Sequence, residues 1–153
     1  MGVIEENYSV KIIRSGKNNS VTTEIWTDQN GANRRPNGPY SINYDHLGRV
    51  TDENYSVWDF DPTLEGNHPS SVRYDPETGQ VKRTIYLDDN GDLHRDLGRP
   101  ALIHFDARTG EVVEQHFYLH GNKVDEHGKL LKDDKDPFVR PAHSPPTSEP
   151  KEP

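Results

Sequence analysis

The chain contains no cysteine, and this absence excludes disulfide bonds, thiol nucleophiles and thiolate metal sites. Apolar residues are also scarce, because they make up 29% of the 153 residues, against about 45–50% (glycine included) in ordinary globular domains. We therefore expect thin structures with local packing instead of one thick core. No apolar run is long enough for a signal peptide or a membrane span, which predicts a cytoplasmic protein without membrane contact.

Basic residues are outnumbered, with 18 lysines and arginines against 26 acidic residues and a net charge of −8. This balance argues against binding to a nucleic-acid backbone, so no nucleic-acid partner is expected. It predicts attraction to a basic surface, for example on another protein. The alternative is that the charge only keeps the protein in solution.

Helical patterning is missing too, since no window of a dozen residues carries apolar positions at helical spacing. The chain has instead short runs of β-branched and aromatic residues with the length and alternation of strands. These runs are SVRY (71–74), QVKRTIYL (80–87), ALIHF (101–105) and EVVEQHFYL (111–119). They predict a mostly β protein of about eight to twelve short strands.

The strand-like runs recur because the sequence repeats itself. NGANRRPNGPYSINYDHLGRV (30–50) matches NGDLHRDLGRPALIHFDARTGEV (90–112), and PSSVRYDPETGQV (69–81) matches PALIHFDARTGEV (100–112) at an offset of 31 residues. A unit of about 31 residues is typical of a repeat protein. We expect a β-hairpin repeat domain over residues 1–131, with copies near 24–50, 55–81 and 86–112 and a partial copy at 117–128.

Each copy contains an aromatic residue, usually followed by aspartate and then by glycine, as in YDHLG (44–48) and FDARTG (105–110). The phrase indicates the end of a strand and a tight turn, in which glycine takes up positive φ. We therefore predict antiparallel β-hairpin repeats, as an open meander or a stacked sheet. The expected core is one strip made by Trp26, Tyr44, Tyr74, Tyr86, Phe105 and Phe117, with Ile42, Val72 and Ile103 beside them.

Two segments depart from the repeat. WDFDPTLEGNH (58–68) replaces a turn phrase and is expected to form an irregular loop. Residues 132–153 are rich in proline and poor in apolar residues, which predicts a disordered C-terminal tail. Phe138 is the main apolar residue of this tail and could serve as a docking motif.

The phrase NGDLHRDLGRPALI (90–103) resembles the motif NG-x-LHR-x-x-GPA-x-I of bacterial and phage proteins built from MORN-like hairpins, including YwqK-type antitoxins. YDHLGRVT (44–51) is also similar to the YD repeat of Rhs-type shells. Over about residues 24–128, the resemblance implies a non-enzymatic β-repeat scaffold. It also implies interaction, antitoxin or immunity roles in place of catalysis.

The predicted binding residues lie mainly beside the longer connections. Four arginines occupy equivalent places there: Arg34, Arg35, Arg95 and Arg99. His94, Trp58 and Phe138 complete the predicted set. A basic and aromatic stripe of this kind would suit an acidic patch on a partner. The alternative is that each arginine pairs with a nearby acid such as Asp88 or Asp96 and helps to set the strand register.

Histidines and acids also raise the question of a metal site. Five of the eight histidines fall within residues 94–127: His94, His104, His116, His120 and His127. DDNGDLH (88–94) places oxygen ligands at alternate positions, which would suit calcium. Polar surface histidines and turn capping by aspartate are the competing interpretations. We identify no catalytic residue and expect no metal or other cofactor.

Two main functional hypotheses follow, with an acidic mimic of nucleic acid as a third possibility. The first is a non-enzymatic protein–protein interaction module, of antitoxin, immunity or inhibitor type, whose partner is another protein. The second is a metal-dependent hydrolase or a glycan-binding repeat protein that uses the histidine-rich C-terminal copies. The sequence does not define the oligomeric state, although the exposed end strands of an open sheet favour self-pairing.

Overall fold

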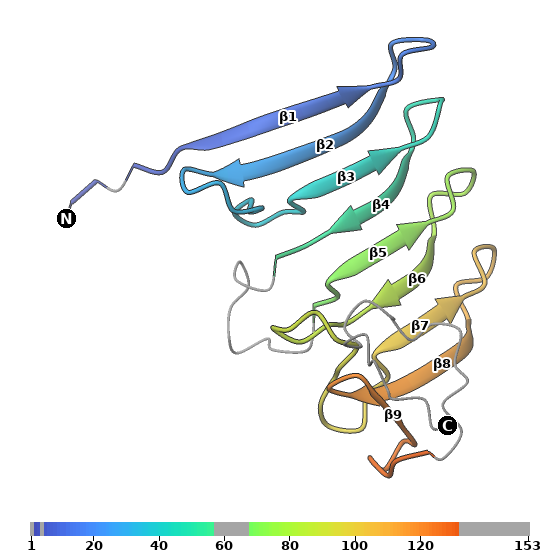
Figure 1. Cartoon of the computed structure of the whole chain (residues 1–153). Helices are drawn as coiled ribbons and strands as arrows, with labels where there is room; N and C mark the ends of the chain where they lie inside the picture. Colours follow the sequence, from blue (N-terminus) through green and yellow to red (C-terminus); the bar gives the residue numbers. More distant parts are fainter. Residues whose placement is uncertain (1, 4, 57–67, 132–153) are drawn as a thin grey trace, which may run out of the picture.

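A computed structural model describes residues 2–3, 5–56 and 68–131, which form a single nine-stranded antiparallel sheet (Figure 1). The strands are β1 (Tyr8–Arg14), β2 (Val21–Asp28), β3 (Ser41–Tyr44), β4 (Val50–Asn54), β5 (Ser71–Tyr74), β6 (Val81–Ile85), β7 (Leu102–Phe105), β8 (Val112–Leu119) and β9 (Asn122–Val124). Their order in the sheet is their order in the sequence, so the predicted open meander is confirmed. The described residues include no helix suited to crossing a membrane.

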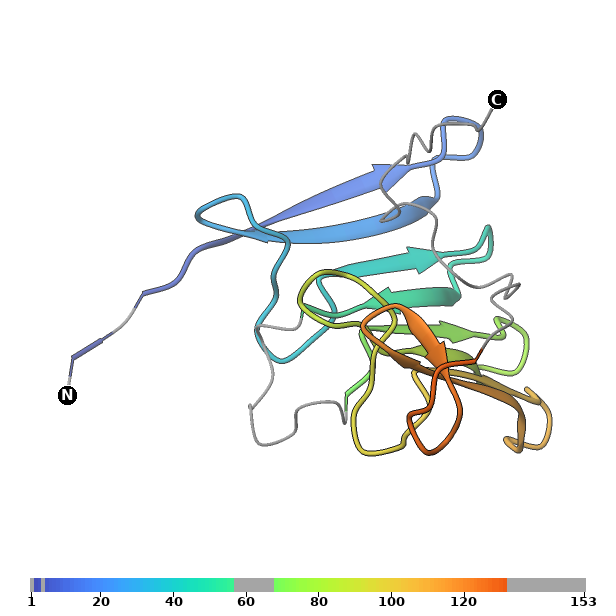
Figure 2. The same ribbon diagram turned by 60° about the horizontal axis from the view of Figure 1, so that its bottom comes forward.

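The two borders formed by the strand ends differ. Tight turns at residues 15–20, 45–49, 75–80 and 106–111 lie together on one side (Figures 1 and 2). The longer connections after β2 and β6 lie on the opposite side. The connection of residues 86–101 separates β6 from β7. Trp58, Phe138, the predicted tail (132–153) and nearly all of the predicted irregular loop lie outside the described residues.

One type of turn, which begins with an aspartate, explains the repeated sequence phrase. Its Oδ1 atom accepts backbone N–H groups two residues and four residues further on, and the third residue after it is a glycine at positive φ. Such turns begin at Asp28, Asp45, Asp88 and Asp125. Turns one residue longer begin at Asp75 and Asp106. The donated N–H groups hold the pKa of Asp45, Asp106 and Asp125 below its usual value.

The register puts the predicted aromatic strip on one face of the sheet. Successive cross-strand partners include Glu24, Ile42, Glu53, Val72, Thr84, Ile103 and Gln115. Because alternate residues of a strand share a face, all nine predicted strip residues lie on this side, which we call the aromatic face. Of these nine residues, only Val72 and Tyr86 are buried. The others are half-buried, so the strip is a partly covered surface and the prediction of a continuous core is corrected.

The most buried cluster lies at the C-terminal end and comprises Tyr86, Leu93, Ala101, Leu102 and Tyr118. Leu102 and Tyr118 are 1% and 0% exposed and lie on the face opposite the aromatic face. They are covered because the 86–101 connection folds back on the end of β8. The Arg95 amide donates to the Tyr118 carbonyl (3.2 Å), and the Gly121 amide donates to the Leu93 carbonyl (2.8 Å).

Candidate functional site

Two of the predicted arginines pack on the aromatic face. The guanidinium carbon of Arg35 lies 4.3 Å from the centre of the Trp26 ring, and that of Arg95 lies 3.7 Å from the centre of the Tyr86 ring. Arg35 is also 3.7 Å from the carboxylate of Glu24. Equivalent arginines thus cover equivalent aromatic rings, in a cation–π arrangement that ties the connections after β2 and β6 to the sheet.

Further contacts of the predicted arginines involve the backbone. Arg95 Nη1 donates to the Pro100 carbonyl (3.2 Å), and burial lowers the pKa of the Arg95 guanidinium. Arg99 Nε donates to the Asp96 carbonyl (3.1 Å), and the Arg34 amide donates to the Trp26 carbonyl (3.1 Å). The first and third connections start four strand spacings apart, about 19 Å. The arginines therefore form two groups at one border.

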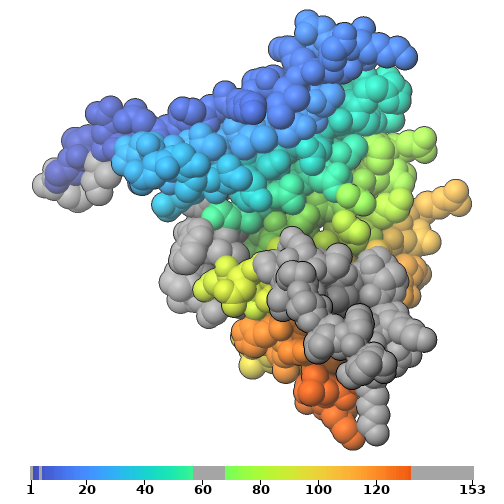
Figure 3. All heavy atoms as spheres, in the orientation of Figure 1, coloured from blue at the N-terminus to red at the C-terminus, as the bar shows by residue number. Residues whose placement is uncertain are grey.

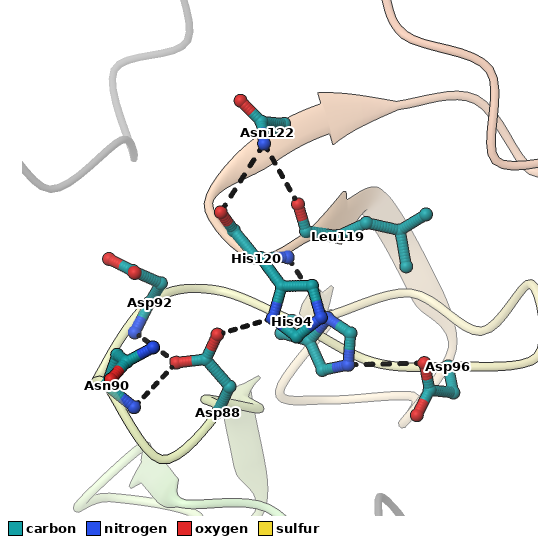
Figure 4. A network of polar contacts seen from close by, with 8 residues as sticks. All are labelled: Asp88, Asn90, Asp92, His94, Asp96, Leu119, His120 and Asn122. Atoms are coloured by element: carbon teal, nitrogen blue, oxygen red, sulfur yellow. Dashed lines mark hydrogen bonds and ion pairs between the residues drawn. The ribbon is translucent and has the colours of Figure 1, made fainter.

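The 86–101 connection also meets the β8–β9 turn through two histidines (Figure 4). The rings of His94 and His120 are stacked, with centres 3.9 Å apart and planes 16° from parallel. The His120 backbone N–H donates to His94 Nδ1 (3.0 Å), so that nitrogen is unprotonated. The proton of neutral His94 is then on Nε2, which lies 3.2 Å from Asp96 Oδ1.

Asp88 completes this network from below the histidine pair (Figure 4). Its Oδ2 lies 2.8 Å from His120 Nδ1, and its Oδ1 accepts the N–H groups of Asn90 and Asp92 at 2.9 and 3.0 Å. Burial raises the pKa of Asp88, but the hydrogen bonds from His120 and the two backbone amides outweigh it, and the pKa lies below its usual value. Asp88 is therefore ionised at neutral pH and joins two connections. Its role as a turn cap is confirmed.

The β8–β9 turn explains why His120 faces this network. His120 and Gly121 both have positive φ (48° and 83°), as a two-residue type I′ hairpin turn requires. Asn122 Nδ2 closes the turn on the Leu119 carbonyl at 3.3 Å. In the first copy, Asp28 makes the same backbone hydrogen bonds, but Arg34 stands in place of His94, so the first copy lacks one member of such a pair.

The arrangement of the histidines bears on the metal hypothesis. Among residues 2–3, 5–56 and 68–131, no group of three or more histidine, aspartate and glutamate side chains is placed to hold a metal ion. His94 Nδ1 is occupied by a backbone N–H, and His94 Nε2 and His120 Nδ1 face carboxylates. These contacts join the 86–101 connection to the β8–β9 turn.

Next to the network, the tip of the connection exposes an apolar side chain. Leu97 is 87% exposed and has φ of 64°, in the left-handed region that costs a non-glycine residue about 1–2 kcal/mol. The next residue is Gly98, at φ 65°, where a Cβ atom would lie 3.0 Å from the Glu126 carbonyl oxygen. Asn37, the equivalent of Leu97 in the first copy, has φ of 57°. Asparagine tolerates this conformation better than leucine.

The sequence interpretation missed Leu97, although alignment of the copies places it against an asparagine at an offset of 60 residues. We call Leu97 and its neighbours His94, Asp96, Arg99 and His120 the loop site. The structure brings the predicted His94 and Arg99 into this site beside Leu97 and leaves Arg34 and Arg35 at the first connection. Comparison with known protein families, curated proteins and solved structures found no match for this chain.

Proposed function

We propose that this protein is a non-enzymatic interaction module that binds another protein through the loop site. The observation that carries the proposal is Leu97, a large apolar side chain that is 87% exposed and held in a costly backbone conformation. Strained backbone that exposes an apolar side chain is typical of a functional position. On a rigid loop, such a side chain suits insertion into a pocket of a partner.

The surroundings of Leu97 fit a protein partner. An apolar anchor with a polar rim is the usual anatomy of a protein–protein interface, and Asp96 and Arg99 supply the rim. The histidine stack and the Asp88 hydrogen bonds fix the connection before binding, which lowers the entropy cost of association. The net charge of −8 favours a partner with a basic surface around its pocket.

The more specific form of the proposal is an inhibitor of antitoxin or immunity type. The resemblance of residues 90–103 to MORN-like and YwqK-type repeats supports it, and so does the acidic charge. In this form the bound partner loses its own activity, because Leu97 occupies a pocket on its surface. The partner's activity assayed with and without this protein separates inhibition from simple binding.

The test uses a substitution taken from the equivalent position of the first copy. Leu97→Asn copies Asn37 of the first copy, so it relieves backbone strain while it removes the apolar anchor. Leu47→Asn is the matched control, because Leu47 is also exposed (63%) but lies in a tight turn at the opposite border. Tagged full-length versions are used to capture proteins from an extract of the source cells.

We expect wild type and Leu47→Asn to retain one protein at near-stoichiometric yield, and Leu97→Asn to lose it without a fall in melting temperature. Undiminished capture by Leu97→Asn would contradict the proposal, as would equal loss with both variants. The hydrolase alternative has less support, because three of the four ring nitrogens of His94 and His120 already face protein partners. No specific contact of the described residues favours glycan binding.

A further inference from the structure

A second surface lies at the other end of the sheet, along β1. This strand forms one long border of the molecule, and β2 is the only described strand beside it (Figure 3). Val10 and Ile12 are each 43% exposed and Ile13 is 38% exposed, although these are residues that sheets normally cover. An open edge with exposed apolar side chains is a template for pairing with another strand.

The direction in which the backbone groups of β1 point follows from the register. The amide of Trp26 donates to the Tyr40 carbonyl, and its carbonyl accepts from the Arg34 amide, so both groups point away from β1. Val10 is the register partner of Trp26, which makes this a non-hydrogen-bonded pair of the antiparallel ladder. The N–H and C=O groups of Val10 therefore point outward, and so do those of Tyr8 and Ile12.

We propose that β1 pairs with β1 of a second copy of this chain, antiparallel and about a two-fold axis at Val10. In this register Val10 pairs with the partner's Val10, Tyr8 with the partner's Ile12 and Glu6 with the partner's Arg14. The extra residue of the bulge at the end of the β1–β2 ladder is Thr22 on β2, so β1 itself is regular along this length. Both copies contribute the same outward backbone groups, so the interface is symmetric and the assembly stops at a dimer.

The charges of β1 favour a second copy of the chain as its partner, and they favour this register. β1 follows two acidic residues, Glu5 and Glu6, and ends at Arg14 with Lys17 beyond it. Antiparallel pairing places the acidic end of one copy against the basic end of the other, and opposite charges across two strands are stabilising. A two-fold axis one residue further along would instead place Lys11 directly opposite the partner's Lys11.

The aromatic face supports the same arrangement. Val10 and Ile12 share this face with their register partners Trp26 and Glu24. Pairing at Val10 therefore continues the face across the axis, with the two valines between Trp26 and the partner's Trp26. The dimer is independent of the proposed function, because the loop site lies at the opposite end of the sheet and both copies of it remain accessible.

Charge reversal tests this register directly. Full-length chains carrying Glu6→Arg or Arg14→Glu alone place like charges opposite each other twice in the dimer. We expect sedimentation equilibrium to show a wild-type dimer, with Kd raised at least about tenfold in each single variant. An equimolar mixture of the two variants restores both opposite-charge pairs and should form a heterodimer. The double variant should recover the wild-type Kd.

Val10→Pro tests the backbone pairing without a change of charge. Proline is tolerated on an edge strand where its missing N–H points outward, so the fold should persist, as measured by circular dichroism, while the dimer is lost. A wild-type chain that remains monomeric would overturn the proposal. So would single charge variants that dimerise like wild type, a mixture that stays monomeric, or a dimer unaffected by a folded Val10→Pro variant.

Discussion

The side chains of the aromatic face are stabilised in one way in the first two copies and in another way in the third copy. In the first copy, Glu24 accepts hydrogen bonds from Trp26 Nε1 (2.6 Å) and from the Tyr44 hydroxyl (3.3 Å). In the next copy, one oxygen of Glu53 accepts the hydroxyl groups of Tyr55 and Tyr74 at 2.5 and 2.9 Å. In each of these two copies, therefore, one carboxylate on the aromatic face accepts hydrogen bonds from two aromatic side chains and fixes their positions.

The third copy has no such carboxylate. Thr84 is the equivalent of Glu53, and Phe105 takes the place of Tyr74. Here the 86–101 connection folds back and buries Tyr86, and a buried carboxylate would lose its hydration. The comparison shows that one repeat can be completed either by charged hydrogen bonds at a half-exposed site or by apolar packing where a connection covers it.

The largest expected effect tests where the buried packing is concentrated. Tyr118→Ala should destabilise the protein by about 4 kcal/mol, because the side chain is fully buried in the C-terminal cluster. Tyr44→Ala, at a half-buried position of the first copy, should cost about half as much. Urea unfolding of the full-length chains measures both. Equal losses would show that burial does not differ between the two regions in solution.

The next effect concerns the carboxylate. Glu53→Ala leaves the Tyr55 and Tyr74 hydroxyls without their acceptor, and we expect a loss of about 1–2 kcal/mol. Glu111→Ala serves as control, because Glu111 is also acidic but is exposed in a tight turn. Thermal unfolding distinguishes the two variants, and similar melting temperatures would mean that the Glu53 hydrogen bonds contribute little.

A smaller effect of opposite sign is expected in the third copy. Thr84 Oγ1 is buried and has no hydrogen-bond partner within the part of the chain that the structure describes. Its cross-strand neighbours are Val72 and Ile103, so Thr84→Val should raise stability by about 1 kcal/mol. A lower melting temperature for this variant would indicate that the hydroxyl is satisfied in solution.

The smallest expected effect concerns the ionisation of Tyr74 and appears only at alkaline pH. Burial and the hydrogen bond to Glu53 raise the pKa of Tyr74 to about 12, above the unfolded value of 10.0. The protonated phenol therefore stabilises the fold fully below pH 10, and this contribution is lost as pH rises from 10 towards 12. Tyr74→Phe should lose less stability than wild type over this window. Tyrosinate absorbance gives the ionisation directly, and an ordinary pKa would contradict the Glu53 arrangement.

Much of the fold was predictable because its signals are local. The run at residues 71–74 is β5 itself, and alternation placed Tyr44, Tyr74 and Phe105 on one face, as the register confirms. Leu102 and Tyr118 were missed because their burial depends on a connection that folds back over β8. In the loop site, His94 was identified from its position, but its stacking on a residue 26 positions away has no local signature.

The order of the strands also determines how the sheet responds to force. Each strand of the described chain contacts only the strand before it and the strand after it. β1 and β9 lie at opposite ends of the sheet, and the ladder hydrogen bonds run perpendicular to the strands. Tension applied between Tyr8 and Val124 is therefore carried by one strand pair after another. We therefore expect the strands to separate one after another at low force. No single energy barrier protects the whole sheet against extension.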